Sequence, residues 1–251
     1  MDYSNLKEQW ITEEKAAFQG WDFSRLNKRR EESPVEWDYI KIVREYLKSD
    51  DLLLDMGTGG GEVLLTIKHP YNLTYATEAY EPNFQLCKKT LASLGIHVAK
   101  VYGDYNDDLP YENEMFDVVI NRHESFDMKE IHRILKPNGF FITQQVGGKN
   151  DMNLSDILGY KRYFEHHTLE NNIDIIENNG FNVIYKNECF PEVKFFDVGT
   201  IVYFAKIIEW EFPGFSVEDY FVKLTDIQKE IESNGFFKNI NHRFIIAANK
   251  K

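Results

Sequence analysis

The chain has 251 residues, a length that fits one large domain or one domain with an added cap. Its 43% hydrophobic and 28% charged residues are ordinary for a globular protein and exclude wholesale disorder. The 29 basic and 41 acidic side chains give a net charge of −12, which disfavours nucleic acids and anionic membranes as partners, because both attract cationic surfaces.

The chain contains two cysteines, Cys87 and Cys189, too few for a disulfide framework or a cysteine-built metal site. No stretch reaches the ~18 consecutive apolar residues that a membrane span needs. The first residues also lack the apolar core of a signal peptide. We therefore expect a cytoplasmic protein with no membrane segment and no bound metal.

The N-terminal part of the chain, residues 1–33, reads as a helical cap of mixed polarity. A helix start signal follows, in which Ser33 can cap, Pro34 suits the first turn and Glu36 can close a capping box. Apolar residues at helical spacing continue from there. The pattern predicts a helix from Pro34 to about Leu47.

From Leu52 onward, short apolar runs alternate with helical segments, the arrangement of a parallel sheet covered by helices on both faces. Prolines and glycines mark the ends of these segments, for example Pro82 and Gly95 around one helix. A further apolar run closes the chain. The predicted strands are Leu52–Leu54, Leu73–Thr77, His97–Tyr102, Phe116–Ile120, Phe140–Val146, Phe181–Glu188 and His242–Ala248.

The later part of the chain is less regular. Helical stretches are predicted near Asp197–Ile208 and Val217–Asn234. We divide the chain into a cap (1–33), a core (34–190), a helical insertion (191–240) and a final core strand (241–251). The insertion is rich in aromatic residues, which can form an acceptor pocket or simply pack the helices; they include Tyr203, Phe204, Trp210, Phe212 and Phe215.

The strongest motif is LLLDMGTGGGE, which begins at Leu52 and runs directly from a predicted strand into a predicted helix. Glycines there allow a tight turn and let a ligand approach the backbone, and the helix amides can bind an anion. A lone glycine loop can also be a turn without a ligand. The spacing lacks the third glycine of the G-x-G-x-x-G dinucleotide fingerprint, so a nicotinamide dehydrogenase is disfavoured.

Two acidic residues follow at the ends of the next strands. Glu78 ends the second strand, where a carboxylate can accept both hydroxyls of a ribose. Asp104, after Gly103, ends the third strand and can accept a hydrogen from the amino group of adenine. Each has a plain alternative, a solvated strand end or a turn cap. Their order after the glycine loop favours a nucleoside-containing ligand.

The chain at this point resembles the class I S-adenosylmethionine-dependent methyltransferases. The resemblance rests on DMGTGGGE at Asp55, on Glu78, on Gly103-Asp104, on LPYENEMFDVV at Leu109 and on ILKPNGFFI at Ile134. It implies a Rossmann-like, doubly wound sheet of seven strands, mostly parallel with an antiparallel last strand, plus a helical cap. It also implies S-adenosyl-L-methionine as the cofactor.

Carried onto this sequence, the resemblance implies that the glycine loop holds the methionine part, Glu78 the ribose and Asp104 the adenine. Tyr80 and Tyr105, which neighbour Glu78 and Asp104, can pack on the base. The cofactor residues that follow from the resemblance are Asp55, Gly57, Thr58, Gly59, Gly61, Glu78, Ala79, Asp104, Tyr105 and Asn121.

Catalytic candidates lie in the segment Asn121-Arg122-His123-Glu124, after the fourth predicted strand. A base is needed only if the acceptor atom has a proton to lose. His123 is the first candidate and Glu124 the second, while a structural histidine is the alternative. Gln144 and Gln145, at the end of the fifth strand, can donate to a substrate or satisfy loop backbone.

The sequence therefore predicts a methyltransferase acting on a small-molecule acceptor. An RNA methyltransferase is the alternative enzyme, and a cofactor-binding protein without catalysis is the alternative of a different class. The acceptor, the atom methylated and the oligomeric state are left open.

Overall fold

A computed structural model describes residues 3–17, 23–101 and 109–251. The chain divides into two compact units, each assembled from separate segments. Unit 2 holds the glycine loop and the predicted sheet, and it comprises Glu36–Val146, His167–Cys189 and Arg243–Lys251.

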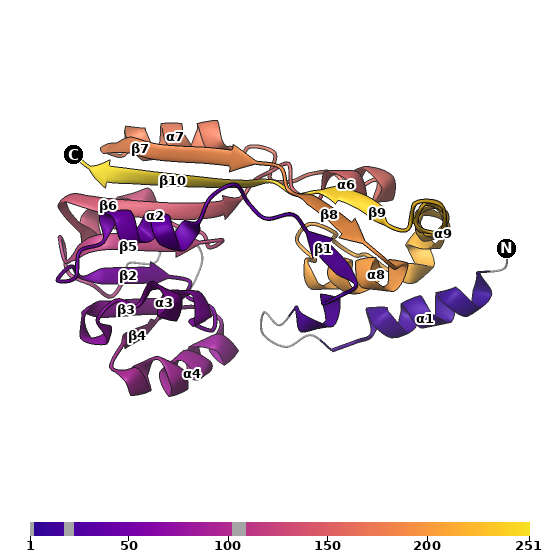
Figure 1. Cartoon of the computed structure of the whole chain (residues 1–251), viewed down its shortest axis with the longest axis horizontal. Helices are drawn as coiled ribbons and strands as arrows, with labels where there is room; N and C mark the ends of the chain where they lie inside the picture. The colour runs from indigo at the N-terminus through magenta and orange to yellow at the C-terminus, as the bar shows by residue number, and fades with distance from the viewer. Residues whose placement is uncertain (1–2, 18–22, 102–108) are drawn as a thin grey trace. The chain divides into compact units, whose positions relative to one another are not determined.

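Unit 2 is built on a seven-stranded sheet with the order β4-β3-β2-β5-β6-β10-β7 (Figure 1). Strand β10 runs antiparallel to both of its neighbours, and the other paired strands are parallel. All seven predicted strands and the antiparallel last strand are confirmed. The strands are β2 (Leu53–Met56), β3 (Thr74–Glu78), β4 (His97–Lys100), β5 (Phe116–Arg122), β6 (Leu135–Val146), β7 (Phe181–Cys189) and β10 (Arg243–Lys250).

Both faces of this sheet are covered. Side chains alternate between the faces of a strand, yet the successive residues Leu53 and Leu54, and likewise Phe141 and Ile142, are fully buried. The helices and 3-10 turns of unit 2 are α2 (Tyr39–Tyr46), α3 (Glu62–Ile67), η2 (Tyr71–Leu73), α4 (Glu81–Thr90), η3 (Ala92–Leu94), α5 (Met128–Ile134) and α7 (Leu169–Asn178).

Helix α2 begins later than the sequence predicts. The predicted start at Pro34 is wrong, because the Ser33 amide donates to the carbonyl of Glu192 at 2.8 Å and leaves the chain extended. The helix is capped instead by Asp38, whose carboxylate accepts from the Lys41 amide at 3.0 Å.

Unit 1 combines the segment up to Val35 with Gly147–His166 and Phe190–His242. Besides the predicted helices it contains a three-stranded antiparallel sheet, β1-β8-β9, that the sequence analysis missed. Its elements are α1 (Ser4–Glu14), η1 (Ser24–Leu26), β1 (Arg30–Glu32), α6 (Met152–Leu158), β8 (Glu192–Phe195), α8 (Val198–Ile207), α9 (Val217–Asn234) and β9 (Phe237–Ile240).

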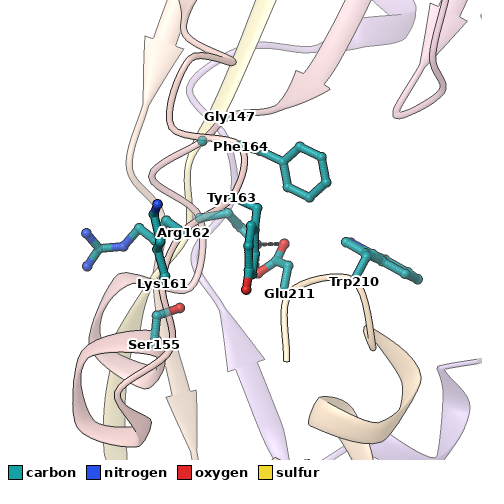
Figure 2. A pocket seen from close by; sticks show the side chains of 10 residues that line it. Gly147, Ser155, Lys161, Arg162, Tyr163, Phe164, Trp210 and Glu211 are labelled. Atoms are coloured by element: carbon teal, nitrogen blue, oxygen red, sulfur yellow. Dashed lines mark hydrogen bonds between the residues drawn. The ribbon is translucent and has the colours of Figure 1, made fainter. Parts of the chain in front are cut away.

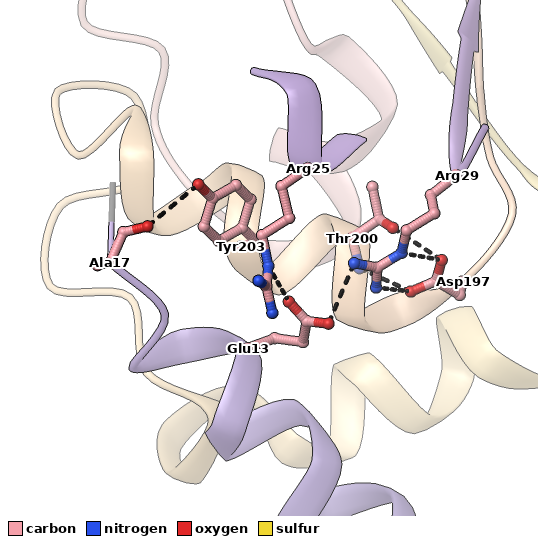
Figure 3. Close-up of polar contacts among 7 residues, drawn as sticks. All are labelled: Glu13, Ala17, Arg25, Arg29, Asp197, Thr200 and Tyr203. Atoms are coloured by element: carbon pink, nitrogen blue, oxygen red, sulfur yellow. Dashed lines mark hydrogen bonds and ion pairs between the residues drawn. The ribbon is translucent and has the colours of Figure 1, made fainter. Parts of the chain in front are cut away.

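An ion-pair network ties the N-terminal segment to α8 (Figure 3). The Arg29 guanidinium donates to both Asp197 oxygens, at 2.6 and 3.0 Å, and its other end lies 3.0 Å from Glu13. Asp197 also caps α8 by accepting from the Thr200 amide at 2.8 Å. Glu13 accepts a further bond from Arg25. Such bidentate pairs fix geometry more firmly than single ion pairs do.

A hydrophobic core that includes Trp10, Leu154, Phe195, Phe212 and Leu224 fills unit 1. Since these residues come from all parts of the unit, its segments stabilise one another. Within the described ranges, no helix is both long and apolar enough to cross a membrane.

Candidate functional site

The glycine loop lies between β2 and α3 and is fixed to the neighbouring strand. Gly57 and Gly61 have φ values of +66° and +85°, a left-handed conformation that other residues adopt only at a cost. Between them, the Thr58 amide donates to the carbonyl of Thr77, on β3, at 3.0 Å. The loop is therefore held open at the carboxyl edge of the sheet.

Gly57 and Gly61 also allow close approach of other side chains. A Cβ on Gly57 would lie 2.5 Å from Cγ of Glu124, and one on Gly61 would lie 2.7 Å from a methyl carbon of Leu91. Gly59 has nothing within 4 Å of the same position. The loop is thus packed at both ends and open at its centre.

Glu78 is fixed at the end of β3, where it is 5% exposed. One carboxylate oxygen accepts from the Gly59 amide and the other from the Tyr80 amide, each at 2.8 Å. Burial raises the pKa of Glu78, although these backbone bonds oppose the shift. The carboxylate keeps free lone pairs at a defined position, which suits recognition of a diol.

Asp55, on β2 directly before the loop, is buried at 7% exposure. Burial raises its pKa to about 7, and the Thr58 side chain and Arg122 only partly counter that effect. The negative charge of Glu78 raises the pKa further. The site therefore combines several carboxyl groups with little neutralising charge, an arrangement that favours a cationic ligand.

Asn121 lies near the end of β5, in register with Met56 of β2. Its side-chain oxygen accepts from Thr143 at 3.0 Å and from Gln145 at 2.6 Å. Its amide nitrogen, Nδ2, is buried and has no hydrogen-bond partner in the described structure. A buried donor without a partner is costly, so a ligand that accepts from it would be stabilised there.

The two catalytic candidates lie beside this network in different settings. The Glu124 side chain packs against Gly57, and the backbone carbonyl of Glu124 accepts from the Gln145 side chain at 3.0 Å. The His123 backbone has φ +61°, and its ring nitrogen Nε2 lies 3.1 Å from Nε2 of Gln144. The structure thus brings Glu124 to the glycine loop and directs His123 toward β6.

The predicted residues Asp104 and Tyr105 lie outside the described residues. Ala79 is exposed directly after Glu78. The sequence analysis missed Trp37 and Thr143, which bond to Gln144 and Asn121. The run of polar residues Thr143-Gln144-Gln145 in an otherwise apolar strand was the signal that could have indicated a network.

A separate pocket lies within unit 1, lined in part by Tyr163, Phe164, Trp210 and Glu211 (Figure 2). The three aromatic side chains are exposed, at 60%, 53% and 47%. Asn150 donates to Glu211 at 3.1 Å. For the other aromatic residues singled out in the sequence, the packing explanation is confirmed, since the buried core of unit 1 contains Tyr203, Phe204, Phe212 and Phe215.

Residues 54–143 match the family model described as a methyltransferase domain, the region that holds the glycine loop, Glu78 and Asn121. No curated protein matches the chain. The matched region carries the glycine loop, and the seven-stranded sheet has the Rossmann-like fold of the class I S-adenosylmethionine-dependent methyltransferases.

Solved structures with the same fold include a candidate methyltransferase from Bacillus halodurans, with a TM-score of 0.57 and 18% identity over 85% of this chain and 98% of that one. A candidate sarcosine dimethylglycine methyltransferase from Galdieria sulphuraria gives 0.51 and 14% over 84% and 82%. The cyclase SpnF gives 0.52 and 16% over 84% and 80%. At these identities the similarity concerns the fold alone.

Proposed function

We propose that unit 2 binds S-adenosylmethionine at the carboxyl edge of its sheet and that the protein transfers the methyl group to a small-molecule acceptor. The observation that carries the proposal is the set of carboxyl groups, Asp55, Glu78 and Glu124, gathered around a fixed glycine loop. Bound there, the cofactor would supply an electrophilic methyl group on a positively charged sulfur.

The residues present fit this cofactor. A sulfonium and an ammonium group suit an acidic site that is withdrawn from water, because low polarity strengthens charge attraction. We assign the ribose hydroxyls to Glu78, whose carboxylate is already oriented by two backbone amides. The methionine part is assigned to the loop at Gly57, Thr58, Gly59 and Gly61 together with Asp55. Asn121 offers a buried amide donor.

Methyl transfer from sulfur is a direct displacement, so the protein mainly has to align the acceptor and exclude water. Glu124 is our candidate for taking a proton from the acceptor, if the acceptor has one to lose. Its place against Gly57 supports this role, because the same loop is assigned to the cofactor.

We assign acceptor recognition to unit 1, with the cap and insertion regions as its parts. The pocket with Tyr163, Trp210 and Glu211 offers aromatic and charged contacts suited to a small polar molecule.

The net charge of −12 supports a small molecule over RNA as the acceptor. The likeness in fold to a candidate sarcosine dimethylglycine methyltransferase is consistent with this choice. The structure described as the cyclase SpnF shares the fold, so the fold by itself does not fix the reaction. The second candidate function is therefore a protein that binds the cofactor without transferring its methyl group.

Calorimetric titration with S-adenosylmethionine, S-adenosylhomocysteine and NAD tests the cofactor assignment. We expect micromolar binding of the two sulfur compounds and no binding of NAD. Absence of binding by the folded protein would remove the proposal.

A panel of small amines, alcohols and thiols then tests methyl transfer. Turnover of a small acceptor would support the proposal. Cofactor binding without turnover on any acceptor would favour the non-catalytic function. A salt-sensitive RNA mobility shift would favour an RNA methyltransferase.

A further inference from the structure

Three side chains of unit 2 form a chain of hydrogen bonds that ends at His123. The Trp37 indole donates to Oε1 of Gln144 at 2.8 Å, and Nε2 of Gln144 lies 3.1 Å from Nε2 of His123. Trp37 and Gln144 are buried, at 8% and 4% exposure. The first two members are therefore held inside the protein.

The chemistry of these groups fixes the direction of each bond. An indole N–H can only donate, so the oxygen of the Gln144 amide must face Trp37. The NH₂ group of Gln144 then faces His123 and can only donate. The ring nitrogen Nε2 of His123 must accept this bond, which places the proton of a neutral ring on Nδ1.

The surroundings favour the neutral ring. Withdrawal from water, followed by the positive charges of Arg122 and Arg243, lowers the pKa of His123 well below its ordinary value. The His123 amide also donates to the Gln144 carbonyl at 2.8 Å, which fixes the backbone of both residues. A proton on Nε2 would break the bond from Gln144 and add a cation near two arginines.

The other side of the ring remains available. His123 keeps part of its surface exposed to water although the rest of the residue is packed against the protein, and its Nδ1 makes no hydrogen bond with any residue in the described ranges. It adjoins Glu124, which lies against the glycine loop. The Nδ1–H group can therefore donate a hydrogen bond to a ligand, whereas Nε2 is already engaged with Gln144.

We propose that Trp37 and Gln144 hold His123 as a neutral Nδ1–H donor, and that this donor binds an oxygen or nitrogen lone pair on the methyl acceptor. Trp37 and Gln144 are positioning residues. The inference rests on the proposed function for the identity of the ligand, while the state of the ring is a property of the protein alone. His123 then orients the acceptor, and proton removal falls to Glu124 or to water.

Long-range ¹H–¹⁵N NMR of the full chain with labelled histidines reports the ring state without cofactor or acceptor. His123→Asn assigns the signal among the 7 histidines. We expect the Nδ1–H tautomer at neutral pH, with protonation only well below the ordinary midpoint of a histidine. The Nε2–H tautomer, or protonation at the ordinary midpoint, would overturn the proposal.

Two variants test the positioning residues. Trp37→Phe removes the indole donor, so the amide of Gln144 can turn its oxygen toward His123, and the Nε2–H tautomer should gain population. Gln144→Glu offers only acceptors, so it should switch His123 to the Nε2–H form and raise its pKa. If the tautomer of His123 is unchanged in both folded variants, the relay, meaning the chain of hydrogen bonds from Trp37 through Gln144 to His123, does not set it.

Trp210→Phe, at an exposed tryptophan of unit 1, is the matched control and should leave the His123 signal unchanged. Titrating the labelled protein with S-adenosylmethionine separates the two proposals. An Nδ1–H ring without cofactor binding would reject the proposed function and retain the relay. Cofactor binding by a protein whose His123 ring is in the Nε2–H form would retain the proposed function and reject the role assigned to His123.

Discussion

Units 1 and 2 differ in how their strands find their partners. In unit 2, the parallel pairs β2–β3, β3–β4 and β5–β6 each join strands that follow one another in the chain. In unit 1, β1 pairs with β8 through Arg30 and Phe195, and both strands are only three or four residues long. Short strands with distant partners carry almost no local pattern, which explains why the sequence predicts the first sheet and misses the second.

The charged side chains of the two units also differ in whether they have partners of opposite charge. Arg29 in unit 1 faces the carboxylates of Asp197 and Glu13, so its charge is matched within the fold. In unit 2, Asp55 is buried with a raised pKa and Glu78 is fixed by backbone amides. Charges that are matched stabilise a fold, whereas buried charges left unmatched are typical of sites that bind a ligand.

The largest expected effect comes from truncating one large, buried side chain in the core of each unit. Phe212 in unit 1 and Phe141 in unit 2 are both fully buried, so Phe212→Ala and Phe141→Ala should each cost about 3–5 kcal/mol of unfolding free energy. Urea unfolding followed by circular dichroism measures the loss.

The cofactor distinguishes these two variants. If it binds unit 2, S-adenosylmethionine at about 100 times its Kd should add roughly 2.7 kcal/mol to the transition that Phe141→Ala weakens. The transition weakened by Phe212→Ala should not respond. If each variant unfolds in a single transition and the cofactor shifts both transitions equally, the two units do not unfold separately.

The next effect is the pH dependence due to Asp55. Its pKa is about 7 in the fold and 3.8 in the unfolded chain, so the folded protein binds the extra proton between these values. The contribution of Asp55 to the unfolding free energy is therefore complete below about pH 4. It falls by roughly 1.4 kcal/mol per pH unit, about 4 kcal/mol in all, as the pH rises to about 7. Asp55→Asn should abolish this slope in urea unfolding. Parallel curves for the two proteins would show that Asp55 ionises normally.

A smaller effect is expected at Glu78. Glu78→Gln keeps the side-chain size, but an amide offers only one acceptor to the two backbone N–H groups of Gly59 and Tyr80. We expect cofactor binding to weaken by about 1–3 kcal/mol in calorimetry. Glu81→Gln, at an exposed neighbouring carboxylate, is the control and should bind like the unmodified protein. Equal affinities for all three would remove Glu78 from the site.

The smallest effect on stability compares a glycine of each unit. Gly57 and Gly214 have similar φ values of +66° and +68°, so alanine at either should cost about 1–2 kcal/mol of unfolding free energy. Only Gly57→Ala also meets the Glu124 side chain, since Gly214 has open space around it. Gly57→Ala should therefore lose cofactor affinity as well, and Gly214→Ala should not. Normal cofactor binding by Gly57→Ala would show that the glycine loop is not part of the cofactor site.

The candidate site shows the same division between local and tertiary information. The glycine motif and Glu78 were predictable, because strand ends and left-handed turns are encoded by a few consecutive residues. The relay from Trp37 through Gln144 to His123 was not, since its members lie on separate elements and meet only when α2 and the sheet pack. Gln144 and His123 were recognised as polar candidates without any indication of which atom faces which.

The sequence by itself determined the seven-stranded sheet and its glycine loop, because these depend on apolar periodicity and on a motif read in order along the chain. Only the tertiary structure decided that Asp38 caps α2, that distant segments build unit 1, and that Nδ2 of Asn121 is left without a partner. The physical reason is that a hydrogen-bonding group takes whichever partner lies within about 3 Å after packing, a choice that no local pattern records.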